Sequence, residues 1–193
     1  MVEICPRLTP TSSLYHSNKA QVQRLKEEKV RSILPALTKV LQDSRLIHLG
    51  GDHRSGCRAV GGSCVIFGEH GKIEGFGEVS DEMLSSNPLK HGVMEAIARV
   101  AESTVAFYQA IPQEDYGQLD LTTCPYLCRN LFAFCWMEPC VMCTMALNHS
   151  RIEILFFVDA QAGDGGCSAH SLHGLRALNH DFLAVQINLD EMT

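Results

Sequence analysis

The feature that most constrains this chain is an apolar segment that runs directly into a Pro-Cys-x-x-Cys motif. Residues 131–137 are entirely apolar, which favours a buried strand. Pro139 follows and suits the first position of a helix, predicted over residues 140–149. Cys140 and Cys143 are three residues apart, so they would lie on one face of that helix near its start. The sequence therefore predicts a strand followed by a helix with two thiols at its N-terminus.

Two thiols in this position favour a metal ion. The positive end of the helix dipole stabilises thiolates, and two converging thiolates suit tetrahedral zinc. A Cys-x-x-Cys pair alone also occurs in redox pairs and structural zinc sites. The third ligand predicted here is His91, which begins an earlier predicted helix. Two helix N-termini beside adjacent parallel strands would bring His91, Cys140 and Cys143 together.

Three protein ligands leave one zinc position open, which is typical of a catalytic site. Water is the expected occupant of that fourth position. A carboxylate that closes the site, such as the chain's own C-terminus, is the alternative.

The remaining pattern indicates an α/β domain behind an N-terminal extension. From residue 59 onward, predicted strands alternate with predicted helices, which favours a layered α/β architecture. A polar, Gly-rich loop over residues 44–58 separates this part from the rest, giving an extension over 1–58 and a zinc domain over 59–193. Residues 1–17 are expected to be irregular. Pro35 lies inside the helical pattern of residues 18–43 and predicts a kink or two short helices. The other predicted elements are a β-hairpin over 60–79, a helix from His91, and strands over 152–158 and 183–189.

Composition excludes several classes of function. The formal charge is −6, so the chain is not a strongly basic nucleic-acid module. No apolar run reaches the roughly 18 residues of a membrane span, and the N-terminus does not resemble a secretory signal. The nine Cys residues are therefore expected to be free thiols or metal ligands. Cys124 and Cys128 allow a second metal site, although two unrelated thiols are the preferred interpretation.

One position argues against catalysis by this chain. Zinc deaminases of nucleobases carry His-x-Glu before Pro-Cys-x-x-Cys, and the Glu moves protons without binding the metal. This chain has His91-Gly92-Val93, so a valine stands in the Glu position. Such proton transfer is worth roughly 10²- to 10⁴-fold in rate, and a valine side chain has no proton to give. Glu95 should point away, because two residues rotate a helical side chain by about 200°. Glu138 is expected to have a structural role near the helix N-terminus.

These motifs resemble those of a known protein family. Residues 87–97, 125–128, 138–147, 149–152 and 178–182 together resemble the non-catalytic subunit of the eukaryotic heterodimeric tRNA wobble-adenosine deaminase, a member of the cytidine deaminase-like superfamily. In that subunit the His-x-Glu glutamate is characteristically replaced by Val. The resemblance implies a three-layer α/β/α fold with a mixed, roughly five-stranded sheet.

The resemblance also implies a function. It predicts a zinc-binding subunit without catalytic residues, paired with a catalytic deaminase subunit in a heterodimer. The complex would convert adenosine to inosine at the tRNA wobble position, in nucleus and cytoplasm, without a membrane partner. Two alternatives remain at this point: an independently active zinc-dependent nucleoside or nucleotide deaminase, and an interaction module that zinc only stabilises.

Overall fold

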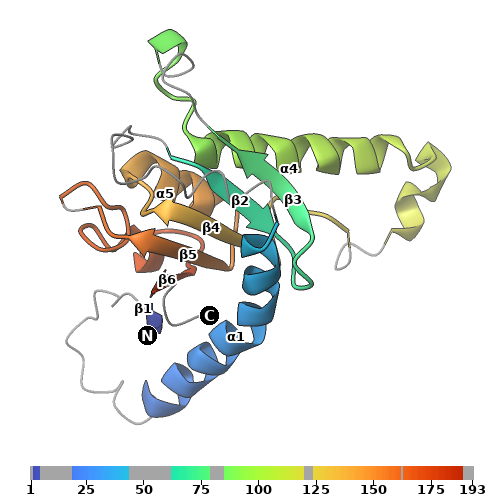
Figure 1. The fold of residues 1–193 in the computed structure, drawn as a ribbon. Helices are drawn as coiled ribbons and strands as arrows, with labels where there is room; N and C mark the ends of the chain where they lie inside the picture. The colour runs from blue at the N-terminus through green and yellow to red at the C-terminus, as the bar shows by residue number, and fades with distance from the viewer. Residues whose placement is uncertain are drawn as a thin grey trace.

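The computed structural model describes residues 2–4, 19–43, 62–78, 85–119, 124–161 and 163–188. Its centre is a six-stranded mixed sheet with the strand order β1-β6-β5-β4-β2-β3 (Figure 1). The strands are β1 (Val2–Ile4), β2 (Cys64–Phe67), β3 (Ile73–Gly77), β4 (Phe132–Met137), β5 (Ile154–Asp159) and β6 (Leu183–Ile187). The helices are α1 (Lys19–Leu41), α4 (Gly92–Gln109) and α5 (Val141–His149), with short 3-10 turns η3 (Gln113–Gln118) and η4 (Leu172–Gly174).

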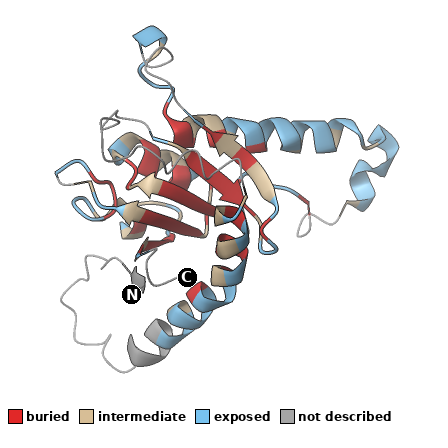
Figure 2. Cartoon of the chain, viewed as in Figure 1, coloured by how far each residue is buried: buried red, intermediate tan, exposed pale blue. Residues whose placement is uncertain are grey.

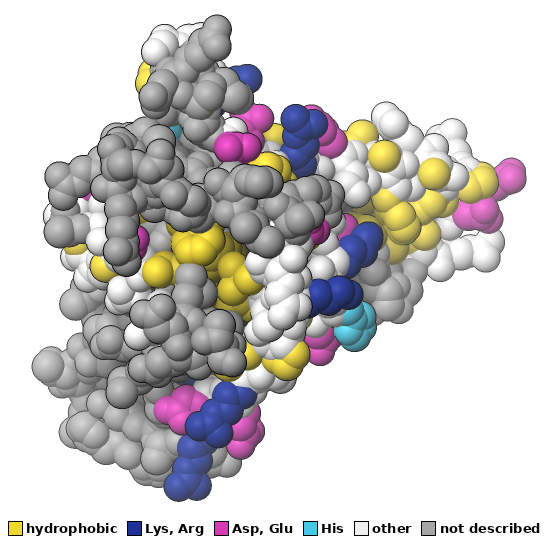
Figure 3. Space-filling view, viewed as in Figure 1, with side chains coloured by type: hydrophobic (Ala, Val, Ile, Leu, Met, Phe, Trp, Pro, Cys, Tyr) yellow, Lys and Arg dark blue, Asp and Glu magenta, His cyan; other side chains and the backbone are white. Residues whose placement is uncertain are grey.

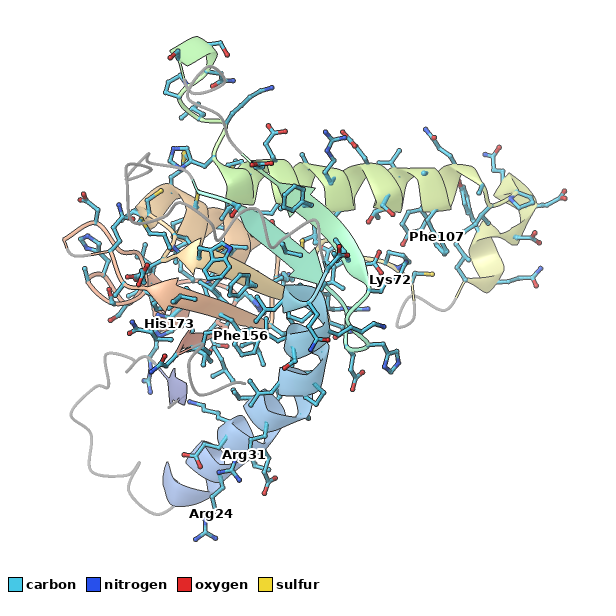
Figure 4. All side chains as sticks on the ribbon, viewed as in Figure 1. Arg24, Arg31, Lys72, Phe107, Phe156 and His173 are labelled. Carbon is cyan, nitrogen blue, oxygen red and sulfur yellow. The ribbon has the colours of Figure 1, made fainter. Side chains whose placement is uncertain are left out.

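The sheet lies between two layers of helices, and the alternation of side chains along its strands explains both cores. In β4, Phe132 and Phe134 face the α1 side, whereas Ala133 and Cys135 face α4 and α5. The side chains of the neighbouring strand β5 also alternate between these two sides of the sheet. Figure 2 shows the buried residues concentrated in these strands and in the helix faces that cover them. Phe156 of β5 lies within the α1-side core (Figure 4). The predicted three-layer α/β/α fold is confirmed.

The strand pairing confirms the predicted elements and adds one strand. β2 and β3 form the expected hairpin, and β2 also pairs antiparallel with β4, so that Cys64 stands opposite Cys135. β4, β5 and β6 are parallel. β1 comes from the segment expected to be irregular, and that part of the expectation is wrong. Three residues were too short for a periodic signal, yet they pair antiparallel with the edge of β6 and satisfy its backbone groups.

Helix α1 continues through Pro35, so the alternative of two short helices is wrong. The side chain of Pro35 is exposed, and Figure 1 shows that the helix axis bends along its length. The helix is held by its opposite face, which packs on the sheet through Val30, Ile33, Ala36, Leu37 and Val40. Burial of these five side chains outweighs the one backbone hydrogen bond that proline removes. The predicted domain boundary at residue 58 lies outside the described residues.

Charged side chains are mixed on the surface. On the face shown in Figure 3, Lys and Arg stand beside Asp and Glu and form no continuous basic area among the described residues. Arg24 on α1 points away from the body of the molecule (Figure 4). Within the described part of the chain, none of the helices has the length and apolar character needed to cross a bilayer.

Glycines in β3 set the position of α4. A Cβ atom at Gly77 would collide with the carbonyl oxygen of Gly92, and one at Gly75 would collide with the carbonyl oxygen of Ala96. The backbone of α4 therefore lies directly on β3, closer than any other residue type would allow. This contact places the N-terminus of α4, and His91 before it, at one end of the sheet.

We predict that Gly77→Ala lowers the free energy of unfolding by about 1–3 kcal/mol or more, because the new methyl group overpacks the contact between α4 and β3. Gly117→Ala is the matched control, since nothing lies within 4 Å of a Cβ atom there. Urea unfolding followed by circular dichroism measures both. Equal midpoints for the two variants would contradict the role given to Gly77.

Candidate metal centre

The structure brings the three predicted metal ligands together. His91 is the N-cap of α4, and Cys140 is the N-cap of α5. His91 Nδ1 lies 3.6 Å from Cys140 Sγ and 3.4 Å from Cys143 Sγ. His91 and Cys143 are buried and Cys140 is half-buried. Among the described residues this is the only cluster of three or more His, Cys, Asp or Glu ligand atoms, all within 4.8 Å of one another.

The helix start differs in detail from the prediction. Pro139 was expected at the first helical position, but α5 begins at Val141. Cys140 has an extended backbone with ψ 171°, and it forms an isolated β-bridge with Gly165. The N–H of Gly166 donates to the carbonyl oxygen of Pro139 at 2.9 Å. These contacts with a later loop hold residues 139 and 140 outside the helix.

The route by which His91 reaches the thiols also differs from the prediction. The strands that precede α4 and α5 were expected to be adjacent and parallel. In the structure β2 lies between β3 and β4 and is antiparallel to both. β3 and β4 nevertheless run in the same direction, so both helices begin at the same end of the sheet. The close packing of α4 on β3 then brings the two N-termini into contact.

The spacing and chemistry of the donors fit zinc. With Zn–N near 2.0 Å and Zn–S near 2.3 Å, tetrahedral geometry requires about 3.5 Å between nitrogen and sulfur. The two observed nitrogen–sulfur distances lie on either side of that value. One imidazole nitrogen and two thiolates are also a ligand set that zinc commonly takes. His91, Cys140 and Cys143 would therefore hold the ion.

The two thiols differ in acidity. The pKa of Cys140 is lowered to about 5, chiefly because the Cys143 thiol donates to its sulfur, with His91 helping against the opposing effect of burial. The same hydrogen bond, together with burial, raises the pKa of Cys143. The lowered pKa of Cys140 favours its thiolate, which is the form that binds metal. Metal binding would displace the proton of the Cys143 thiol.

A small cavity of about 30 Å³ opens beside the three side chains. Val93 is buried and lines this cavity. Met137 and Cys135 also line it. Gly62, Ser63, Glu138, Pro139 and Gln161 complete the lining. Trp136, the neighbour of Met137, packs edge-to-face against Phe134 on the opposite side of the sheet.

Two carboxylates flank the site in the sequence, and neither is free to serve it. Glu95 does not line the cavity, and its carboxylate lies 4.0 Å from the Lys90 ammonium group. Glu138 does line the cavity, but both of its oxygens accept hydrogen bonds, from Gln161, Cys167 and Ser168. Glu138 therefore has the structural role predicted for it.

The cavity contains residues that sequence reasoning missed. Cys135 belongs to the strand that was predicted to be buried and it is a core residue, but it also lines the cavity. The alternation of β4 could have revealed this, because Cys135 and Met137 share one face. Gln161 carries no such signal, since a loop brings it to the site. Cys124 and Cys128 belong to no described metal cluster, and burial raises the pKa of Cys128 to about 11. The proposed closure by the C-terminus lies outside the described residues.

The known proteins with similar sequences have names that refer to tRNA-specific adenosine deaminases. The chain is 36% identical over 107 residues to tRNA-specific adenosine deaminase subunit tad3 of Schizosaccharomyces pombe, covering 55% of this chain and 32% of that protein. It is 30% identical over 156 residues to a human protein named probable inactive tRNA-specific adenosine deaminase-like protein 3, covering 70% and 43%. This chain is therefore similar in sequence to the Tad3 proteins. It spans less than half the length of these curated relatives.

Two further comparisons concern family models and solved structures. No family model matches this sequence. A solved structure from a study of A-to-I editing by tRNA:A34 deaminases has a TM-score of 0.44 and 15% identity, over 63% of this chain and 80% of that one. Likeness at that level decides nothing by itself.

We predict that Cys140→Ser or Cys143→Ser reduces the zinc content of the purified chain from about one ion to well below half, because each variant leaves only two strong ligands. Cys124→Ser is the control and keeps its zinc. Elemental analysis after dialysis measures the content, and a thermal scan checks that zinc no longer raises Tm. Full zinc occupancy in both site variants would exclude these ligands.

Proposed function

We propose that this chain is a zinc-binding, catalytically silent subunit of a tRNA-specific adenosine deaminase. A catalytic deaminase subunit would be its partner, and the heterodimer would convert adenosine to inosine at the tRNA wobble position. The observation that carries the proposal is Val93. A buried hydrocarbon side chain faces the cavity at the position where the deaminase motif has its proton-transferring Glu.

Within the part of the chain that the structure describes, the surroundings of Val93 supply no substitute for that Glu. The carboxylate of Glu95 lies outside the cavity, near Lys90. Glu138 is beside the cavity, but its oxygens are occupied by hydrogen bonds from the loop. His91 and the two thiols are the groups that would hold zinc, so they are not free to act as bases. Loss of general acid–base catalysis alone costs roughly 10²- to 10⁴-fold in rate.

Zinc would have a structural consequence here. A bound ion would supply Lewis acidity, and it would also link the N-termini of α4 and α5 across their contact. The zinc domain would then be stabilised for its role as a partner. A module of this kind contributes shape and contacts to an assembly, while the chemistry takes place in the other subunit.

The partner and the tRNA rest on the names of the relatives. Those proteins are named as tRNA-specific adenosine deaminase subunits or as inactive deaminase-like proteins. We extend the names to this chain as part of the proposal, with nucleus and cytoplasm as the proposed location. The chain is acidic overall, so the catalytic subunit or other segments would contribute much of the positive surface that tRNA requires.

The proposal predicts activity only in the complex. The purified chain should release no inosine from a tRNA with adenosine at the wobble position, whereas the chain co-purified with a catalytic deaminase subunit should do so. Inosine is measured by sequencing or by mass spectrometry of nucleosides. The catalytic subunit alone is the control. Deamination of tRNA, adenosine or cytidine at an enzymatic rate by this chain alone would overturn the proposal.

Restoring the missing carboxylate should not restore activity. We predict that Val93→Glu in the isolated chain remains inactive on adenosine and on tRNA, because in the proposed heterodimer the substrate adenosine binds in the catalytic subunit. Val93→Gln is the matched control for the added volume, and zinc content and circular dichroism report on folding in both variants. Inosine production by Val93→Glu, but not by Val93→Gln, would contradict the proposal that the substrate adenosine binds only in the partner subunit.

A further inference from the structure

Glu138 is a buried side chain with an unusually complete set of hydrogen bonds. Its exposed fraction is 2%. One oxygen accepts from the backbone N–H groups of Cys167, at 2.9 Å, and Ser168, at 2.6 Å. The other accepts from the N–H of Gln161 at 2.9 Å and the hydroxyl of Ser168 at 2.6 Å. A carboxylate offers about four lone-pair positions, so all of them are used.

The donors come from one loop, whose described residues are 161 and 163–168 and which lies against the start of α5. A Cβ atom at Gly165 would collide with the Glu138 carboxylate, and one at Gly166 would collide with Thr144 Oγ1. The loop therefore has no room to shift toward the helix. Without the carboxylate, its three N–H groups would lose their charged acceptor.

The same loop contacts the residues that lead into the first thiol ligand. Gly166 donates its N–H to the carbonyl oxygen of Pro139, and Gly165 forms a β-bridge with Cys140. On the other side, the N–H of Glu138 donates to the carbonyl oxygen of Asp159 at 2.8 Å. The segment from Glu138 to Cys140 is thus held between β5 and the loop. Glu138 is part of this segment and also the anchor of the loop.

We propose that Glu138 is a positioning residue for the metal centre. By fixing the loop against residues 138–140, its carboxylate fixes the Cys140 sulfur at the distance from His91 and Cys143 that a metal ion requires. This inference rests on the metal-binding part of the proposed function. It assigns Glu138 no role in proton transfer.

The test replaces one acceptor oxygen with a donor. Glu138→Gln places an amide NH₂ against loop donors, so at least one buried N–H loses its partner. Partners that orient metal ligands are typically worth 10- to 100-fold in metal affinity, and we expect a loss of that size for zinc. Competition with a chromophoric chelator measures it in the purified full chain. Glu95→Gln makes the same chemical change outside the cavity and should leave zinc affinity unchanged.

A second readout separates positioning from general stability. Cobalt(II) alone is added to the metal-free chain, and its thiolate charge-transfer and d–d bands report the ligand geometry. The bands should change in Glu138→Gln and stay the same in Glu95→Gln. Ser168→Ala removes one of the four hydrogen bonds and should lower zinc affinity by a smaller factor. If Glu138→Gln does not fold, the zinc affinity of Ser168→Ala tests the proposal in its place.

Two results would overturn the inference. The first leaves the proposed metal site in place, and the second overturns the metal site as well. A folded Glu138→Gln or Ser168→Ala variant with faster amide exchange in the loop, but with wild-type zinc affinity and cobalt bands, would leave Glu138 a role in the loop alone. A wild-type chain that binds neither zinc nor cobalt would overturn the proposed metal site itself, and this inference with it.

Discussion

The close contact between α4 and β3 determines where the candidate metal centre forms. Two glycines let the helix backbone lie directly on the strand, so the distance of the start of α4 from the sheet and the direction of the helix are fixed. His91 then stands at the same end of the sheet as the start of α5, although the two helices follow strands that are not neighbours. The cavity, the cluster of donors and the role of Val93 all depend on this placement.

The site separates metal binding from proton transfer. The donors for an ion are present, with spacing that tetrahedral zinc requires. Among the described residues, no carboxylate beside the site is free to move protons. A valine stands at the Glu position of the motif, the Lys90 ammonium group lies near Glu95, and backbone N–H groups donate to Glu138. The described part of the site therefore combines a set of metal ligands with carboxylates that are held by other contacts.

Much of the fold could be predicted from the sequence, because strong periodic patterns report burial directly. The all-apolar strand before Pro139, the hairpin and the helix that follows His91 are all of this kind. β1 and the position of β2 between β3 and β4 were missed, since pairing between distant segments leaves no local pattern. The three-residue spacing and the helix starts indicated the ligand triad. The four hydrogen bonds of Glu138 could not be predicted, because a later loop supplies the donors.

The strand β4 serves the metal centre with one face and the α1-side core with the other. Cys135 and Met137 line the cavity, while Phe134 and Trp136 pack against each other on the far side. Gain or loss of a single residue within β4 would exchange these two sets and put aromatic rings into the metal cavity. This segment can therefore change by substitution during evolution but not in length, and variation in length has to fall in the loops at its ends.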